Sequence, residues 1–121
     1  WWECGYPDGV LSADELAHGI HGGQSETSIM LHLRPDLVRM DEALDFRPTT
    51  YSVHTDNRRL RLTGAPAAAW MAQDLHPAGV AGNAAAATAE SGRVIVEAAS
   101  AGLAILLDET ADYPLANLRE R

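Results

Sequence analysis

Cysteine, basic side chains and long apolar runs are all scarce in this sequence. Cys4 is the only cysteine among 121 residues, so no disulfide can form within the chain, and no histidine lies near it to activate it as a nucleophile. Nine basic residues against 17 acidic ones leave a net charge of −8, which excludes the basic surface that nucleic-acid binding needs. No stretch reaches the ~18–20 apolar residues of a membrane-spanning helix, and we see no signal peptide. These absences predict a cytoplasmic protein with neither a nucleic-acid nor a membrane partner.

The length and composition are those of one globular domain or part of one, since 46% of the residues are hydrophobic and 21% are charged. The sequence starts with Trp1-Trp2 rather than with methionine. We therefore expect residues 1–121 to be a single partial domain, the back part of a longer protein.

Residues with useful chemistry concentrate in the segment 18–41. His21 is followed at once by Gly22-Gly23, and Glu26 comes five residues after the histidine. Consecutive glycines allow backbone conformations that other residues avoid, and they let a ligand approach the main chain closely. The pattern predicts a histidine on a glycine rim, which is a suitable place for hydrolytic chemistry.

An apolar helix is expected directly after this rim, over residues 25–34. Ser25 or Thr27 can cap its N-terminus, and Pro35 requires it to end at or before Arg34. The first amides of such a helix favour negative charge. The spacing therefore places the histidine beside the positive end of a helix.

Three further elements are expected elsewhere in the chain. Ser12 and Glu15 have the spacing of a capping box and predict a short helix. Residues 49–53 are rich in β-forming side chains and predict a strand. Apolar residues spaced by three and four predict a long amphipathic helix over 86–108 that faces a core. Gly92 inside that helix costs roughly 1 kcal/mol relative to alanine, which a close approach to a strand or another helix would explain.

Two blocks of this sequence resemble the signature of the creatininase family of metal-dependent amidohydrolases. The first block is a His-Gly-Gly turn, two variable residues, Glu-Thr-Ser, an apolar helix and Leu-x-Pro-x-Leu-Val. The second is a glycine-containing loop followed by Ala-Thr-Ala-Glu-Lys-Gly, with serine in place of the lysine here. In this sequence the blocks read His21-Gly22-Gly23, Gln24-Ser25, Glu26-Thr27-Ser28 and Leu33-Arg34-Pro35-Asp36-Leu37-Val38, then Asp74 to Asn83 and Ala87-Thr88-Ala89-Glu90-Ser91-Gly92.

The resemblance implies an α/β fold, the C-terminal part of a three-layer α/β/α creatininase-like fold. The helices 25–34 and 86–108 would then cover a partly parallel sheet. It also implies metal-dependent hydrolysis of a C–N amide bond in a small cyclic amide or a formamide, and a homo-oligomer such as a hexamer. The intact family fold uses divalent metals (zinc, manganese or iron) held by segments of its front half. We find no counterpart of those segments here, so we expect this chain alone to bind no metal.

The resemblance also assigns roles to single residues. His21 would be the acid/base that contacts the substrate, and Glu26 would orient either His21 or the start of the helix. An equally open alternative makes Glu26 a first-turn acid that the helix dipole favours. Trp2 matches an aromatic residue beside the family's substrate pocket only loosely, and a place in the core is as open for it. The substrate-binding candidates are Trp2, His18, Gly22 and Gly23.

Two other functions remain open from the sequence. The chain could be a non-catalytic α/β subunit, or a degenerate paralogue that lacks the metal-binding half. It could also be a small-molecule binding domain that uses the loop 74–82, which carries one proline and two glycines.

Overall fold

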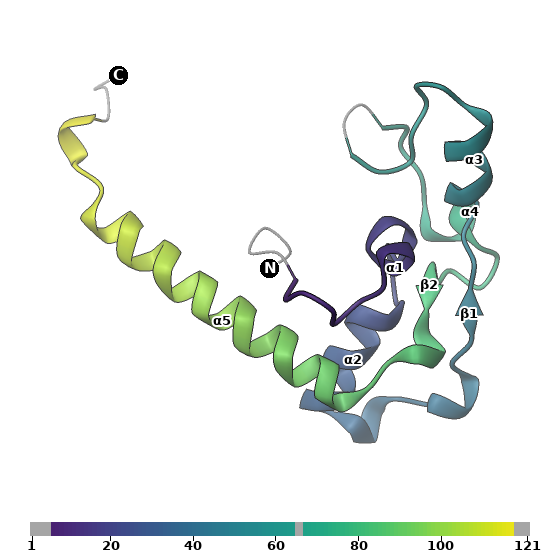
Figure 1. The fold of residues 1–121 in the computed structure, drawn as a ribbon, viewed down its shortest axis with the longest axis horizontal. Helices are drawn as coiled ribbons and strands as arrows, with labels where there is room; N and C mark the ends of the chain where they lie inside the picture. Colours follow the sequence, from purple (N-terminus) through teal and green to yellow (C-terminus); the bar gives the residue numbers. More distant parts are fainter. Residues whose placement is uncertain (1–5, 65–66, 118–121) are drawn as a thin grey trace.

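The computed structural model describes residues 6–64 and 67–117, in which short helices and a small sheet form a body and one long helix extends from it (Figure 1). The helices are α1 (Ala13–His18), α2 (Gln24–Leu33), α3 (Thr50–Asp56), α4 (Ala72–Leu75) and α5 (Ala89–Asp112). The strands are β1 (Asp45–Phe46) and β2 (Gly82–Asn83), and short 3-10 turns cover Pro35–Leu37, Met40–Glu42, Ala84–Ala86 and Leu115–Asn117.

The first turns of α5 pack closely against α2 (Figure 1). Gly92 is buried at this contact, and a Cβ atom at its position would overlap the main-chain carbonyl of Ser28. Ser28 is fully buried, and its Oγ accepts a hydrogen bond of 3.1 Å from the N–H of Thr88. The expectation that Gly92 marks a close approach is therefore confirmed, and the neighbouring element is a helix.

The limits of α2 agree with the sequence at its end and differ at its start. The helix stops before Pro35, as expected from the missing N–H and the steric demands of proline. At the other end, Gly23 is the N-cap residue, and it has no side chain to accept a hydrogen bond. Ser25 and Thr27 lie inside the first turn, so the expectation that one of them caps the helix is wrong.

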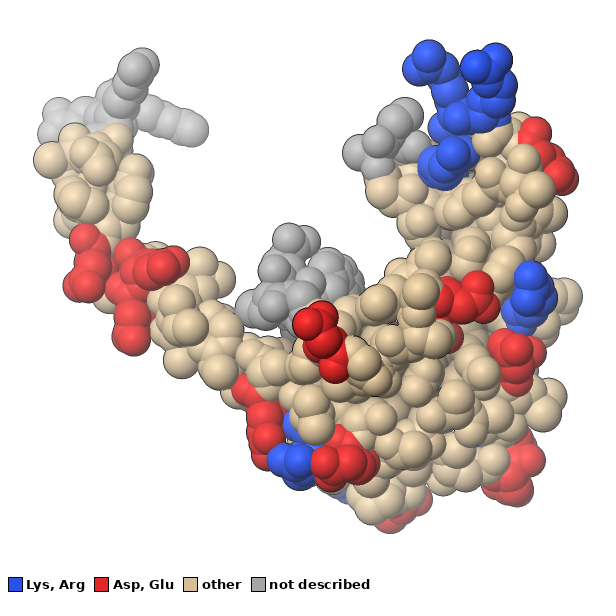
Figure 2. Space-filling view, in the orientation of Figure 1, with Lys and Arg blue, Asp and Glu red and all other residues tan. Residues whose placement is uncertain are grey.

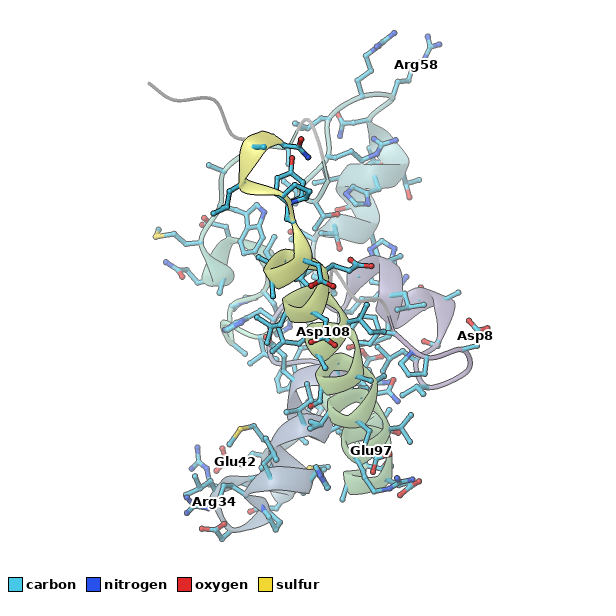
Figure 3. The ribbon with its side chains drawn as sticks, turned by 90° about the vertical axis from the view of Figure 1, so that its left-hand side faces the viewer. Asp8, Arg34, Glu42, Arg58, Glu97 and Asp108 are labelled. Atoms are coloured by element: carbon cyan, nitrogen blue, oxygen red, sulfur yellow. The ribbon has the colours of Figure 1, made fainter. Side chains whose placement is uncertain are left out.

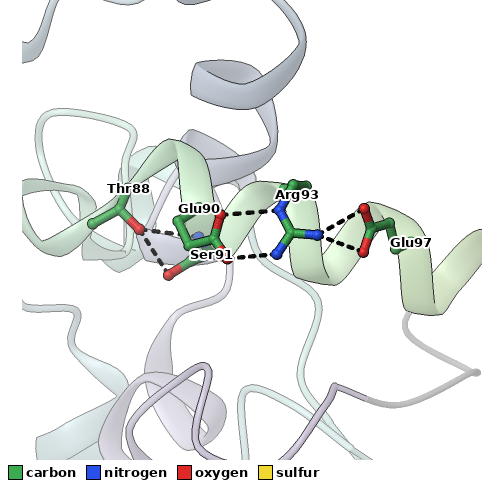
Figure 4. Close-up of polar contacts among 5 residues, drawn as sticks. All are labelled: Thr88, Glu90, Ser91, Arg93 and Glu97. Atoms are coloured by element: carbon green, nitrogen blue, oxygen red, sulfur yellow. Dashed lines mark hydrogen bonds and ion pairs between the residues drawn. The ribbon is translucent and has the colours of Figure 1, made fainter.

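A side-chain cap sets the start of α5 at Ala89 rather than at residue 86. The Oγ1 atom of Thr88 accepts a hydrogen bond of 3.0 Å from the N–H of Ser91 (Figure 4). One turn further on, Arg93 bridges Glu90 and Glu97, with N–O distances of 2.5 Å and 2.7 Å. Because these ion pairs are exposed to solvent, each contributes little to stability.

We expect the Thr88→Ala substitution to lower the free energy of unfolding by about 1 kcal/mol, because the first turn of α5 loses its side-chain acceptor. Chemical denaturation followed by circular dichroism measures the change. Thr88→Ser keeps the oxygen and serves as the control, with an expected change of a few tenths of a kcal/mol. Equal losses in the two variants would show that the hydroxyl does not cap the helix.

The distal half of α5 extends away from the body of the protein (Figure 1). Ile95, next to α2, is 2% exposed, whereas Leu103 and Leu106 are 52% and 54% exposed. The helix also continues to Asp112 rather than stopping at residue 108. The predicted stripe facing a core thus holds only for the part of α5 near α2. Over residues 6–64 and 67–117, none of the helices combines the length and apolar character that a membrane crossing requires.

The small sheet pairs β1 with β2 in antiparallel register, Asp45 opposite Asn83 and Phe46 opposite Gly82. Among the described residues this is the only sheet and its pairing is antiparallel, so no parallel pair of strands lies beneath the two helices there. The helices α2 and α5 bury their facing sides against each other instead.

The strand predicted at residues 49–53 is also wrong, because this segment forms the helix α3. Thr50 is fully buried on α3, and its hydroxyl meets the imidazole of His18 at 2.9 Å. Tyr51, the next residue, stacks on the same imidazole. These long-range contacts outweigh the β-propensity of the segment, which reflects packing context more than the backbone itself.

Most charged side chains lie on the outside of the fold. Basic side chains gather at one corner beyond α3, and acidic ones are spread over the body and α5 (Figure 2). Arg58 points outward at that corner, and Asp8, Arg34 and Glu42 do so at other edges (Figure 3). Glu15 is the exception, because it is the one charged side chain among the described residues that is buried, at 6% exposure.

Candidate active site

The main chain of His21 is fixed by an isolated antiparallel bridge to Ala81. The N–H of His21 donates to the Ala81 carbonyl at 3.1 Å, and the Ala81 N–H donates back at 2.7 Å. Gly22 follows with φ of +65°, a conformation that residues with a side chain rarely adopt. The backbone is therefore held while the imidazole itself remains 57% exposed.

Glu26, in the first turn of α2, faces this imidazole. Its Oε2 atom lies 3.7 Å from Nδ1 of His21 and also accepts a hydrogen bond from the N–H of Gly22. The 3.7 Å separation is longer than a hydrogen bond, but catalytic contacts are often loose before substrate binds. The Glu26 carboxylate thus accepts the N–H of Gly22, just before α2, and also lies beside the His21 ring. Because Nδ1 is the ring nitrogen near Glu26, Nε2 is the nitrogen on the other side of the ring.

Glu15 contributes to this region in a way that the sequence did not indicate. Its N–H donates to the Ser12 hydroxyl at 3.1 Å, so the predicted cap of α1 is confirmed. Its carboxylate, however, accepts hydrogen bonds from the N–H of Gln24 at 2.6 Å and from the N–H of Asn83 at 2.9 Å. It therefore satisfies the first amide of α2, which Gly23 cannot cap. The glycines at positions 19, 23 and 82 were the signal in the sequence for a side chain buried among them, but only the fold brings these glycines together.

His18 and His21 do not share a helix face, because α1 ends at His18. The His18 ring lies toward α3, with Nδ1 at 2.9 Å from the Thr50 hydroxyl and its centroid 3.7 Å from that of Tyr51. The His18 side chain is thus already engaged by protein groups. It lines a narrow cavity of about 40 Å³ that is separate from the hollows around Glu26.

Tyr51 is enclosed on this side of the molecule. The Arg47 guanidinium lies 3.6 Å from its ring centroid, and the phenol bonds to Asp14. Burial, followed by the hydrogen bond to Asp14, raises the pKa of Tyr51 to about 12, so the phenol stays neutral near pH 7. Burial also lowers the pKa of His54, with the nearby Arg61 acting in the same direction. The rings of Tyr51 and His54 thus lie beside the His18 ring, with centroids at 3.7 Å and 5.7 Å.

Two hollows meet at Glu26. The first, of about 560 Å³, is lined by Gly23, Glu26, Leu62 and Trp70, and the second, of about 690 Å³, by Gly22, Glu26 and Phe46 among others. Both volumes are in the range of small-molecule sites. His21 lines neither hollow; it directly precedes Gly22, which lines the second. Trp70 was not singled out in the sequence, because its segment 67–71 has no regular structure and reaches the site only through the fold.

The structure thus brings together His21, Glu26, Gly22 and Gly23 and directs His18 elsewhere, while Trp2 lies outside the described residues. Over the ranges 6–64 and 67–117, no group of three or more His, Cys, Asp or Glu side chains is arranged to hold a metal ion. The described part of the chain therefore does not fit a complete metal centre by itself.

Comparison with known proteins decides the family. The creatininase profile, described as creatinine amidohydrolase, matches residues 1–107 of this sequence. The chain belongs to the creatininase family. The resemblance seen in the His-Gly-Gly and Glu-Thr-Ser blocks is thereby confirmed.

Two creatininase relatives show how much of the family fold is present. A creatinine amidohydrolase from Pseudomonas putida is 48% identical over 46 residues, which are 38% of this chain and 16% of that protein. A crystal structure from Bacteroides fragilis NCTC 9343, provisionally described as a creatinine amidohydrolase, matches with a TM-score of 0.69 and 30% identity. That match covers 95% of this chain and 42% of the other. The chain therefore spans less than half the length of these creatininase relatives, and its creatininase-like α/β fold class is confirmed.

Proposed function

We propose that this chain supplies the acid–base part of a creatininase-family amidohydrolase that cleaves the C–N bond of a small cyclic amide or a formamide. The observation that carries the proposal is the exposed imidazole of His21, held on a fixed backbone with the Glu26 carboxylate 3.7 Å from Nδ1. The proposal also rests on family membership.

Hydrolysis of an amide requires a proton on the leaving nitrogen, because an amine anion is a poor leaving group. Nε2 of His21 would donate that proton, since Nδ1 lies on the side of Glu26. The carboxylate would keep the ring in one orientation. Gly22, with no side chain, would let the substrate approach the main chain next to the ring, whereas at Gly23 the corresponding space is taken by the Glu15 carboxylate and Gly82.

The intact family fold is expected to use divalent zinc, manganese or iron, and we propose that their ligands come from outside the described residues. The substrate-binding roles of His18 and Trp2 and a homo-oligomer such as a hexamer remain parts of the proposal that rest on the resemblance. The single partial domain and the cytoplasmic location also remain parts of it, and they rest on the length and composition of the sequence.

A non-catalytic subunit or degenerate paralogue is the second candidate. It is favoured by the absence of a metal-binding group of three or more side chains among the described residues. The two candidates differ in one result, which is hydrolysis by the complete natural protein when divalent zinc, manganese or iron is supplied.

We expect Glu26→Gln to lower the rate of that hydrolysis by about 10- to 100-fold, because the imidazole loses the charge that orients it. The assay follows loss of creatinine and release of formate from formamide. Glu109→Gln, an exposed carboxylate on α5, is the control and should leave the rate unchanged. No hydrolysis of either substrate by the unaltered protein with metal present would reject the enzyme proposal and favour the non-catalytic subunit.

A further inference from the structure

We infer that Glu15 is a positioning residue for His21. Its buried carboxylate holds together the segment that contains His21 and the segment that pairs with the His21 main chain. Its importance for catalysis rests on the proposed function of His21. The structural part of the inference, the clamp itself, concerns this chain's own residues and can be tested without activity.

The clamp joins two segments that are distant in the sequence. Oε1 of Glu15 accepts the Gln24 N–H at 2.6 Å, three residues after His21. Oε2 accepts the Asn83 N–H at 2.9 Å, two residues after Ala81, which forms the bridge to His21. Both sides of the main-chain bridge are therefore attached to the same carboxylate, one oxygen to each.

Three glycines make room for this carboxylate. A Cβ atom at Gly19 or at Gly23 would overlap Oε1 of Glu15, and one at Gly82 would lie 2.9 Å from it. The main chains also touch, because a Cβ at Gly82 would be 2.8 Å from the Cα of Gly23. Glycines from three segments thus surround a single side chain, and the contact between these segments exists only without side chains at those positions.

A buried carboxylate is tolerated only where its oxygens accept hydrogen bonds. The amide group of glutamine would turn one acceptor into a donor that faces a main-chain N–H. In a Glu15→Gln variant one of the two segments must therefore separate from the clamp. Because the His21 ring is exposed and held mainly through its backbone, that separation would shift the ring, and a displacement of about 1 Å can reduce a rate by about 10²-fold.

The unaltered chain provides the first test, which does not depend on any variant folding. Nuclear magnetic resonance should detect couplings across the two hydrogen bonds, from the amide nitrogens of Gln24 and Asn83 to the carboxylate carbon of Glu15. In Glu15→Gln, at least one coupling should be lost, and the Gly22 amide and His21 ring signals should shift. Glu109→Gln should leave them in place. Absence of both couplings in the unaltered chain would overturn the clamp.

The second test separates positioning from simple stability. In the complete protein, kcat of Glu15→Gln should fall about 10- to 100-fold while KM changes less than about twofold, under conditions where the variant is fully folded. A variant that is merely less stable would keep both the kcat of its folded fraction and its His21 signals, and this result would reject the inference. If the couplings and shifts are found but the unaltered protein hydrolyses no amide, the clamp stands and the proposed function fails.

Discussion

Replacing His21 with alanine is expected to lower amide hydrolysis by the complete protein by about 10²- to 10⁴-fold. The imidazole is the group that would deliver a proton to the leaving nitrogen, whereas the Glu26 carboxylate lies on its Nδ1 side and accepts the Gly22 N–H. The bridge to Ala81 uses only main-chain atoms of His21, so the fold should persist in the variant. Steady-state rates at saturating substrate and metal provide the measurement.

The matched control for this prediction is His32→Ala, which removes an exposed imidazole from the last turn of α2. It should leave the rate within about twofold of the unaltered protein. The expected loss for His21→Ala should appear mainly in kcat, because proton delivery belongs to the transition state rather than to substrate binding. Unchanged turnover in His21→Ala would remove the imidazole from the mechanism and with it the main support for the proposed function.

Changing Gly92 to alanine is expected to give the largest loss of stability, about 3 kcal/mol. The new methyl group would overlap the main-chain carbonyl of Ser28, and a backbone atom cannot move aside as the end of a flexible side chain can. The helices α2 and α5 would have to separate, which would also expose Ser28 and break its bond to the Thr88 N–H. A loss of this size is a large part of the about 5–15 kcal/mol that stabilises a typical domain.

Thermal and chemical unfolding of Gly92→Ala and of Ser100→Ala measure this effect. Ser100 is exposed on the same helix, so its change should stay within about 0.5 kcal/mol. In a helix free of neighbours, alanine would be more stable than glycine by roughly 1 kcal/mol. A stabilised Gly92→Ala variant would therefore mean that α2 and α5 do not touch at this position.

Local features of the sequence predicted several parts of the fold. The stop of α2 before Pro35, the Ser12 cap of α1 and a close approach at Gly92 were all expected from residue type and spacing. Each of them depends on one residue and its near neighbours in the chain, or on the cost of glycine within a helix. The family resemblance likewise rested on two local blocks.

Other parts could not be predicted because they depend on distant contacts. The segment 49–53 has β-forming side chains, yet it becomes the helix α3 through its packing on His18. The long helix was expected to bury its apolar side along its whole length, yet Leu103 and Leu106 are exposed to solvent while Ile95 is buried. Periodicity indicates which side of a helix is apolar, but only the fold determines which part of that side meets a partner.

For the site, the sequence by itself determined that His21, Gly22-Gly23 and Glu26 lie near one another, since all four fall within six residues, and the structure puts the Glu26 carboxylate 3.7 Å from the ring. Only the tertiary structure decided that His18 lies toward α3 and that Glu15 accepts the amides of Gln24 and Asn83. The physical reason is that a buried carboxylate must find donors wherever the folded chain offers them, and spacing along the sequence contains no record of a donor 68 residues away.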